Sequence, residues 1–136
     1  MAFISLGIIV IVVSDSRDEQ TDRSGKVLEE RIIKSGHKLV EKIFLKDNLD
    51  EIKLKLKLLT EDSNHNVIIL SGGTGLTGRD STPEAVKSII TKEIPGFGEI
   101  FRMISYNKIS TSSLQSRAIA GLCGDKFIFS LPGSPG

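Results

Sequence analysis

Two kinds of apolar pattern alternate along the chain. Residues 7–13 form an unbroken run, Gly-Ile-Ile-Val-Ile-Val-Val, and residues 66–70 include Val-Ile-Ile-Leu. Apolar runs without polar alternation are typical of parallel strands that are covered on both faces. Residues 38–45 and 127–131 are two further predicted strands, the last one after a Gly-Asp turn.

Helical spacing marks the segments between these strands. After a polar stretch over residues 14–25, one helical face carries four apolar residues and ends at Gly36: Val27, Leu28, Ile32 and Ile33. In the next helix the apolar residues recur at i, i+3, i+7 and i+10: Leu49, Ile52, Leu56 and Leu59. Three lysines of that helix are predicted to be largely turned to solvent: Lys53, Lys55 and Lys57.

The second half of the chain has weaker signals. Thr82 is a predicted N-cap, because a proline follows at the first helical position and a glutamate lies in the first turn. A third helix therefore begins there. Residues 95–103 predict a short helix, and residues 110–121 fit a helix and a strand equally well.

Strands that alternate with helices indicate βαβ units with right-handed crossovers. We therefore predict an α/β fold with three layers, α/β/α, around a mostly parallel central sheet. Residues 1–136 are predicted to form one domain. A buried parallel strand is normally followed by a covering helix, so we expect a carboxy-terminal helix that this sequence does not include.

Composition narrows the class of protein and of partner. The 136 residues are 39% hydrophobic and 26% charged, which is typical of a globular domain and excludes disordered, collagen-like and membrane chains. Eighteen basic against 17 acidic residues give a net charge of +1, which argues against nucleic acid or an anionic membrane as the main partner. The apolar run over residues 3–13 is too short to cross a bilayer. A single cysteine, Cys123, fits a reducing compartment, and we expect a cytoplasmic protein.

The loops that follow predicted strands are where an α/β sheet binds ligands. Residues 71–80 read Ser-Gly-Gly-Thr-Gly-Leu-Thr-Gly-Arg-Asp. Four glycines allow backbone N–H groups to converge on an anion, with nearby hydroxyls as further donors and Arg79 as a countercharge. A phosphate site and a plain tight turn remain equally good explanations. The formal Gly-x-Gly-x-x-Gly pattern is weak support for a dinucleotide site, since the helix-start signal comes only at Thr82.

Asp47 and Asp80 follow different strands, and they would face one ligand if their loops open on the same edge of the sheet. Two carboxylates together with phosphate oxygens are a common way to hold Mg²⁺. The alternative is that Asp47 caps the second helix and Asp80 belongs to the approach to the third. Asp15, after the first strand, invites the same comparison with a surface acid.

Other residues with reactive side chains offer weaker candidates. His37 and His65 lie beside predicted turns without metal-ligand spacing, and both are predicted to be exposed to solvent. Cys123 lies next to a buried strand and has no histidine near it in sequence, which favours a small core residue over a nucleophile.

Residues 71–85 as a whole resemble the signature loop of the MoaB/Mog family of molybdenum-cofactor biosynthesis proteins. Five further segments resemble family segments in the same order: Ser14-Asp15, Asp22-Arg23-Ser24-Gly25, Pro95-Gly96-Phe97-Gly98-Glu99, Ser116-Arg117-Ala118 and Leu131-Pro132-Gly133-Ser134-Pro135. The resemblance thus covers nearly the whole chain, and it favours the phosphate and Mg²⁺ interpretations.

The resemblance implies binding of molybdopterin, a pterin with a dithiolene and a terminal phosphate. In active members this phosphate attacks the α-phosphorus of Mg-ATP, which yields adenylyl-molybdopterin and pyrophosphate. The alternative is a non-catalytic carrier or scaffold that binds molybdopterin. The expected partners are molybdopterin, ATP with Mg²⁺, and further copies of the chain in a trimer or hexamer.

The resemblance also implies roles for particular residues. Asp47 and Asp80 match the two functional aspartates and would serve in catalysis and hold Mg²⁺. Phosphate and nucleotide binding is expected at Ser14, Asp15, Ser71, Gly72, Gly73, Thr74 and Gly75. Molybdopterin binding is expected at Ser24, Arg79, Pro132, Gly133 and Ser134.

Residues 95–106 carry more apolar surface than a short surface helix needs. The residues concerned are Phe97, Ile100, Phe101 and Met103. This segment is therefore the predicted contact between copies of the chain.

Overall fold

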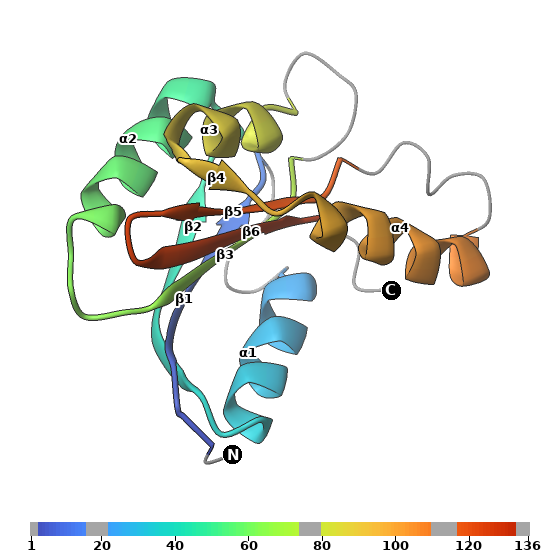
Figure 1. The fold of residues 1–136 in the computed structure, drawn as a ribbon, viewed down its shortest axis with the longest axis horizontal. Coiled ribbons are helices and arrows are strands. Elements are labelled where there is room, and N and C mark those ends of the chain that lie inside the picture. Colours follow the sequence, from blue (N-terminus) through green and yellow to red (C-terminus); the bar gives the residue numbers. More distant parts are fainter. Residues whose placement is uncertain (1–2, 16–21, 74–79, 110–116, 133–136) are drawn as a thin grey trace.

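A computed structural model describes residues 3–15, 22–73, 80–109 and 117–132, with only the backbone for 108 and 109. These residues form ten elements in the order β1 Gly7–Val13, α1 Ser24–Lys34, β2 Lys38–Leu45, α2 Leu49–Thr60, β3 Val67–Ser71, α3 Thr82–Ile89, β4 Lys92–Glu93, α4 Pro95–Ile109, β5 Ile119–Cys123 and β6 Lys126–Leu131 (Figure 1). The predicted alternation of strands and helices is confirmed.

The strands of the described residues form one six-stranded sheet in the order β2-β1-β3-β6-β5-β4. β1 runs parallel to β2 and β3, and β3 runs parallel to β6. β5 and β4 are antiparallel additions at the edge. Gly124, with φ of 61°, lies in the two-residue turn that connects β5 to β6, and such a turn reverses the chain direction. The sheet is therefore mostly parallel, as predicted.

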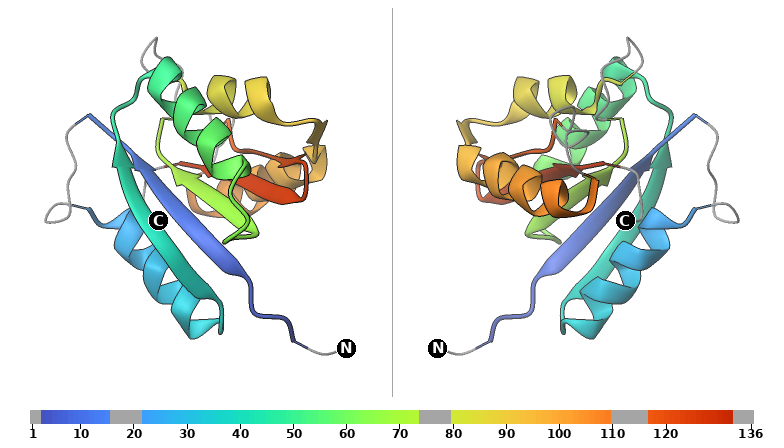
Figure 2. Two further views of the ribbon diagram at one scale, coloured as in Figure 1. Left: turned by 90° about the vertical axis from the view of Figure 1, so that its left-hand side faces the viewer. Right: turned by 90° about the vertical axis from the view of Figure 1, so that its right-hand side faces the viewer.

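Helices cover both faces of the sheet, which confirms the three layers (Figure 2). On one face, Ile52 and Leu56 of α2 and Val86 of α3 join a core with Ile11 and Leu70 of the sheet. Alternate residues of the same strands face α1 on the other side and form a second, smaller core around Ile32. α4 reaches this second face, where Phe97 packs edge-on against Phe129 with ring centroids 5.2 Å apart.

Two helix boundaries and one position expected to be buried differ from the prediction. Ser81, not Thr82, is the N-cap of α3, and it makes no side-chain capping bond. α4 continues to Ile109 instead of ending near residue 103. Ile33 does not share the buried face of α1, because its side chain is 58% exposed.

The strands β4 and β5 lie where the sequence pattern was weakest. β5 occupies the end of the segment that fitted helix and strand equally well, and the two-residue β4 was not predicted. The short β5 run, Ile-Ala-Gly-Leu-Cys, owes its strand conformation to pairing with β6. Cys123, expected as a small core residue, is partly buried and packs against the main core.

Side-chain exposure corrects the expectations for both histidines and for two of the three lysines. His65 is only 1% exposed, so the prediction that it faces solvent was wrong. The reason is that only Asn66 separates it from the buried strand β3, and the covered Lys126 donates to its carbonyl oxygen at 2.7 Å. His37 is half-buried and its Nδ1 accepts from Leu6 N at 3.0 Å. Of the three lysines predicted to face solvent, Lys57 is exposed and the other two are half-buried.

In the part of the chain that the structure describes, no helix has the length and apolar character needed to span a membrane.

Candidate functional site

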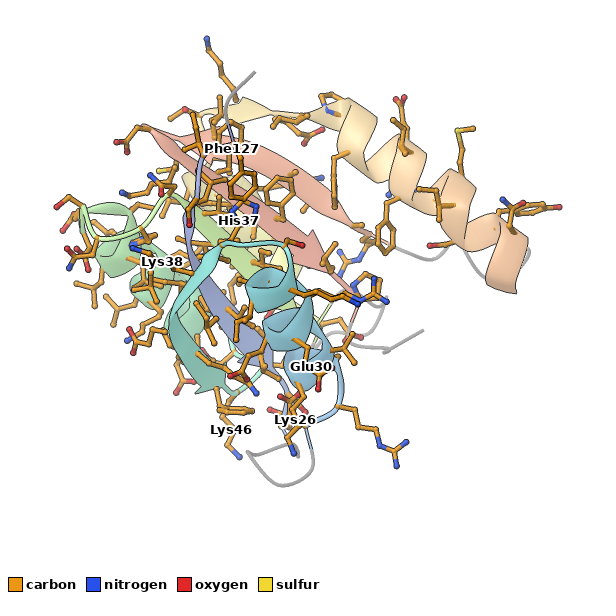
Figure 3. The ribbon with its side chains drawn as sticks, turned by 90° about the horizontal axis from the view of Figure 1, so that it is seen from below. Lys26, Glu30, His37, Lys38, Lys46 and Phe127 are labelled. Atoms are coloured by element: carbon orange, nitrogen blue, oxygen red, sulfur yellow. The ribbon has the colours of Figure 1, made fainter. Side chains whose placement is uncertain are left out.

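The four parallel strands end at one edge of the sheet, which brings the loops after them together. Ser14 N donates to Leu45 O at 2.9 Å and so joins the ends of β1 and β2. Gly72 N donates to Leu131 O at 2.9 Å and joins the ends of β3 and β6. Figure 3 shows Lys26 and Lys46 toward this end of the molecule and His37 and Lys38 toward the other.

Asp47 connects two of these loops through its carboxylate. Oδ1 accepts from Ser81 N at 3.1 Å and from Ser81 Oγ at 2.7 Å, and the residue is only 8% exposed. Asn48, not Asp47, caps α2 by accepting from Glu51 N at 3.1 Å. The capping alternative for Asp47 was therefore wrong, and its carboxylate faces the segment that carries Asp80.

Asp80 is half-buried and directly precedes Ser81. Its backbone oxygen accepts from the Arg117 guanidinium at 2.7 Å, and the same guanidinium contacts Glu84 at 2.7 Å. These bonds hold the backbone of residues 80–84 against Arg117, which lies shortly before β5. Asp80 is thus held by its neighbours on the same edge as Asp47.

The described glycines of the loop after β3 have no room for a side chain. Gly72 has φ of 107°, and a Cβ there would lie 2.2 Å from Val13 O. Gly73 has φ of 68°, and its Cβ would lie 2.2 Å from Thr82 Oγ1 and 3.0 Å from Asp47 Oδ2. The backbone of the loop therefore passes directly against the Asp47 carboxylate, and the glycines are needed for the turn whatever binds there.

Hydroxyl groups line the neighbouring part of the edge. Ser24 Oγ lies 3.2 Å from Ser71 Oγ, and both residues are buried. Asp15 is exposed, but it is more than a surface acid, since its Oδ1 accepts from Asp47 N at 3.2 Å. The start of α1, the end of β3 and the loop after β1 thus meet beside Asp47.

The donor set of this edge fits Mg²⁺. Asp47 and Asp80 offer hard carboxylate oxygens, which this ion prefers, and phosphate oxygens would complete its coordination. Asp47 Oδ2 faces the glycine backbone, 3.0 Å from the position that a Cβ on Gly73 would take. No group of three or more His, Cys, Asp or Glu side chains suited to a metal occurs among the described residues.

Comparison with known proteins identifies the family. Residues 9–136 match the model of the "probable molybdopterin binding domain" family. Molybdenum cofactor biosynthesis protein B of Bacillus cereus is 44% identical over 128 residues, which cover 93% of this chain and 76% of that protein. The chain belongs to the MoaB family of molybdenum-cofactor biosynthesis proteins. The resemblance inferred from the sequence is thereby confirmed.

Two solved structures extend the match to MoaB proteins in three dimensions. A crystal structure of molybdenum cofactor biosynthesis protein B superposes with a TM-score of 0.95 at 42% identity and covers all of this chain and 85% of that one. A structure described as molybdopterin biosynthesis enzyme MoaB from Thermus thermophilus has a TM-score of 0.84 at 29% identity, over 96% of this chain and 82% of that one. The fold of this MoaB-family chain is thus that of its solved relatives.

The structure brings together most of the described residues expected from the MoaB resemblance. Asp15 accepts from Asp47 N, and Ser24 lies against Ser71. Ser14 and Pro132 follow β1 and β6 at the same edge. The remaining expected residues lie outside the described residues: Thr74, Gly75, Arg79, Gly133 and Ser134. Their roles stay predictions.

Three residues that contact the site were not assigned a role from the sequence. Ser81 holds Asp47, Arg117 holds the backbone of Asp80, and Asp22 accepts from Gly25 N at 2.8 Å at the start of α1. Asp22 and Arg117 lie in segments that resemble the family, so their position was available as a signal. Ser81 also lies in such a segment, residues 71–85, but its partner Asp47 is 34 residues away, so the contact itself had no local signal.

Proposed function

We propose that this chain is a molybdopterin adenylyltransferase, formed by a single domain over residues 1–136. A terminal phosphate oxygen of molybdopterin attacks the α-phosphorus of ATP and forms a new P–O bond. The bond from that phosphorus to the oxygen bridging to the β-phosphate breaks, and pyrophosphate leaves. The observation that carries the proposal is the double hydrogen bond from Ser81 to the Asp47 carboxylate, next to Asp80 and against the glycine backbone.

The chain's residues would act by position and charge. Because the substrate's phosphate is itself the nucleophile, the protein needs no nucleophilic side chain. Asp47 and Asp80 would hold Mg²⁺ on the nucleotide, and Ser81 orients Asp47 by donating from two atoms. A bound Mg²⁺ supplies positive charge that neutralises the phosphate oxygens as charge shifts to the leaving group.

The polar groups beside Asp47 suit the two substrates. The backbone around Gly72 and Gly73 would approach the phosphates closely, which side chains there would prevent. The hydroxyls of Ser24 and Ser71 would donate to molybdopterin or its phosphate. Further support comes from the Thermus relative, which is described as a molybdopterin biosynthesis enzyme.

The test is formation of adenylyl-molybdopterin and pyrophosphate from purified molybdopterin and Mg-ATP. Asp47→Asn and Asp80→Asn should each slow the reaction by a factor on the order of 100 or more, about 3 kcal/mol in the barrier, because the amide removes the charge that holds Mg²⁺. The melting temperature should stay nearly unchanged. Asp50→Asn, in the first turn of α2 and exposed, is the matched control and should keep the wild-type rate.

Equal rates in wild type, Asp47→Asn and Asp80→Asn would refute the metal role. No product from the wild-type protein, with molybdopterin still bound, would favour the second candidate function, a non-catalytic carrier or scaffold.

An apolar surface on α4 supports this second candidate and also self-association. Four side chains of the helix are at least half exposed: Ile100 59%, Met103 69%, Ile104 60% and Tyr106 54%. Figure 1 shows α4 extending beyond the edge of the sheet, so the sheet does not cover this surface. Exposed apolar surface of this kind commonly binds another protein or another copy. We propose a trimer or hexamer in which α4 contacts neighbouring copies.

Sedimentation equilibrium tests this assembly. Wild type should sediment as a trimer or hexamer at micromolar concentration, and Met103→Glu with Ile104→Glu should shift it toward the monomer, because charges would be buried in the contact. The same two changes at Leu54 and Leu58, exposed on α2, are the control and should leave the assembly intact. A monomeric wild type would contradict the proposal.

A further inference from the structure

An ion pair is buried at the start of α1, away from the Asp47 carboxylate. Asp22 Oδ2 lies 2.8 Å from Lys42 Nζ, with the Asp22 side chain fully buried and the Lys42 side chain 9% exposed. Lys42 comes from β2, and it lies opposite Val10 on the face that α1 covers. Its Nζ also lies 3.6 Å from Glu29 Oε2 and 5.4 Å above the Phe44 ring. One lysine thus ties the first two turns of α1 to the sheet.

Asp22 holds the helix start with its other oxygen. Oδ1 accepts from Gly25 N at 2.8 Å, an i to i+3 bond of the kind that N-caps make. The N-cap residue itself, Arg23, makes no side-chain capping bond, and α1 has no acid in its first turn. The capping of this helix therefore depends on Asp22, and the direction of the Asp22 carboxylate depends on Lys42.

Stability does not by itself account for such a pair. Removing two charges from water costs about as much as their attraction returns, and an apolar pair of similar volume is often as stable. What the pair does is fix geometry: Gly25 is packed so closely that a Cβ would lie 2.2 Å from Asp22 Oδ2 and 2.8 Å from Val12 Cγ2. Ser24 lies between Asp22 and Gly25 in the sequence, and its Oγ lies 3.2 Å from Ser71 Oγ.

We propose that Asp22 and Lys42 are positioning residues for ligand binding. Their ion pair holds the start of α1 so that the Ser24 hydroxyl stays beside Ser71, at the edge of the sheet where the parallel strands end and the ligand is proposed to bind. This inference rests on the proposed function for the ligand, which is molybdopterin. Neither residue touches the substrate; both act through Ser24.

A double-mutant cycle on the dissociation constant of molybdopterin tests the inference. Asp22→Asn keeps an oxygen for Gly25 N and removes the charge that Lys42 holds, and Ser24→Ala removes the hydroxyl. Each single change should weaken binding by about tenfold, the size of one well-placed hydrogen bond. The double variant should be no weaker than Ser24→Ala alone, because Asp22 acts only through Ser24. The KM for Mg-ATP should change less than twofold in all of them.

Substitutions at Lys42 give a second route that does not depend on how Asp22→Asn folds. Lys42→Arg keeps the ion pair and should retain binding within about threefold, whereas Lys42→Met should lose about tenfold. Lys38→Met makes the same chemical change at an exposed position of the same strand and should bind as wild type does. Circular dichroism should give the wild-type spectrum throughout.

The outcomes separate the two proposals. Wild type that binds molybdopterin, with additive losses in the double variant or equal weakening of Mg-ATP, would overturn the positioning role and leave the proposed function standing. Equal losses in Lys38→Met and Lys42→Met would overturn it as well. Wild type that binds no molybdopterin would overturn both.

Discussion

Polar side chains are buried at both ends of the parallel strands, but their hydrogen bonding differs. At the carboxyl edge the Asp47 carboxylate accepts two hydrogen bonds from Ser81, and Ser24 lies against Ser71. At the amino edge His65 is as deeply buried, yet neither ring nitrogen has a hydrogen-bond partner within the described residues. The Asp47 carboxylate and the Ser24 hydroxyl at the first edge are oriented by partners, although the buried Thr82 Oγ1 beside Gly73 has none among the described residues. At the second edge the unpaired imidazole carries a cost in stability.

Electrostatic effects on His65 also distinguish the amino edge from the carboxyl edge. Burial, and then the nearby Lys126 ammonium, lower the pKa of His65 below its ordinary value of 6.5, against a smaller opposing effect of Asp62 and Asp125. A neutral imidazole is thus favoured at the amino edge. We therefore expect a rule for this molecule: changes at the carboxyl edge should alter chemistry, and changes at the amino edge should alter stability. Three predictions test it.

The largest effect is expected at Gly72, where the rule should fail because turn and site share one backbone. Gly72→Ala should lower the free energy of unfolding by at least about 2 kcal/mol, since the new Cβ meets Val13 O in a backbone conformation that disfavours side chains. Ligand binding should be lost as well. Gly96→Ala, in α4 with open space around its Cβ, is the control and should cost nothing. Urea denaturation measures the free energy of unfolding of both variants. Equal stability of the two would contradict the described turn.

The second prediction sharpens the contrast at the amino edge. The folded-state pKa of His65 lies below 6.5. As the pH falls below 6.5, His65 therefore becomes protonated in the unfolded chain while it is still neutral in the folded chain. The free energy of unfolding therefore falls as the pH drops from about 6.5 toward the lowered folded-state pKa. The slope from this one group is at most about 1.4 kcal/mol per pH unit.

Denaturation of wild type and His65→Leu between pH 5 and pH 8, a range of about three units around the ordinary histidine value, checks this slope. The variant should show a shallower fall in unfolding free energy below pH 6.5, while its adenylylation rate at pH 8 should match wild type. Parallel curves for the two proteins would show that His65 does not carry the dependence.

The smallest effect is expected at Ser81. Ser81→Ala removes the 2.7 Å bond to Asp47 Oδ1 and leaves the backbone bond in place. Adenylylation should slow by about tenfold, because Asp47 keeps its charge but loses part of its orientation. The free energy of unfolding should fall by no more than about 1 kcal/mol. A rate equal to wild type would mean that the backbone bond alone positions the carboxylate.

Much of the fold could be predicted because its signals are local. The apolar run at 7–13 and the predicted strand at 38–45 match β1 and β2 at both ends, and the helical spacing from Leu49 to Leu59 matches α2. A buried strand needs apolar residues on both faces and a helix needs them on one, so the sequence carries these patterns itself. β5 carries no such pattern, since its conformation depends on pairing with β6.

The candidate site could be predicted in part for the same reason. Glycine segments and aspartates after strands are local features, and the order of resembling segments pointed to the family. The roles of Ser81 and Lys42 depend on partners that are 34 and 20 residues away in the chain (Ser81 to Asp47, and Lys42 to Asp22). No spacing rule reaches across such distances.

By itself, then, the sequence determined the alternating elements, the parallel core and the family, because hydrophobic periodicity and motif order are properties of the chain. Only the tertiary structure decided that Asn48 rather than Asp47 caps α2, that Asp47 turns to Ser81, and that His65 is buried. A side chain's hydrogen-bond partner and its exposure depend on which segments the sheet brings together. In this protein, the register of β1, β2, β3 and β6 sets which segments meet.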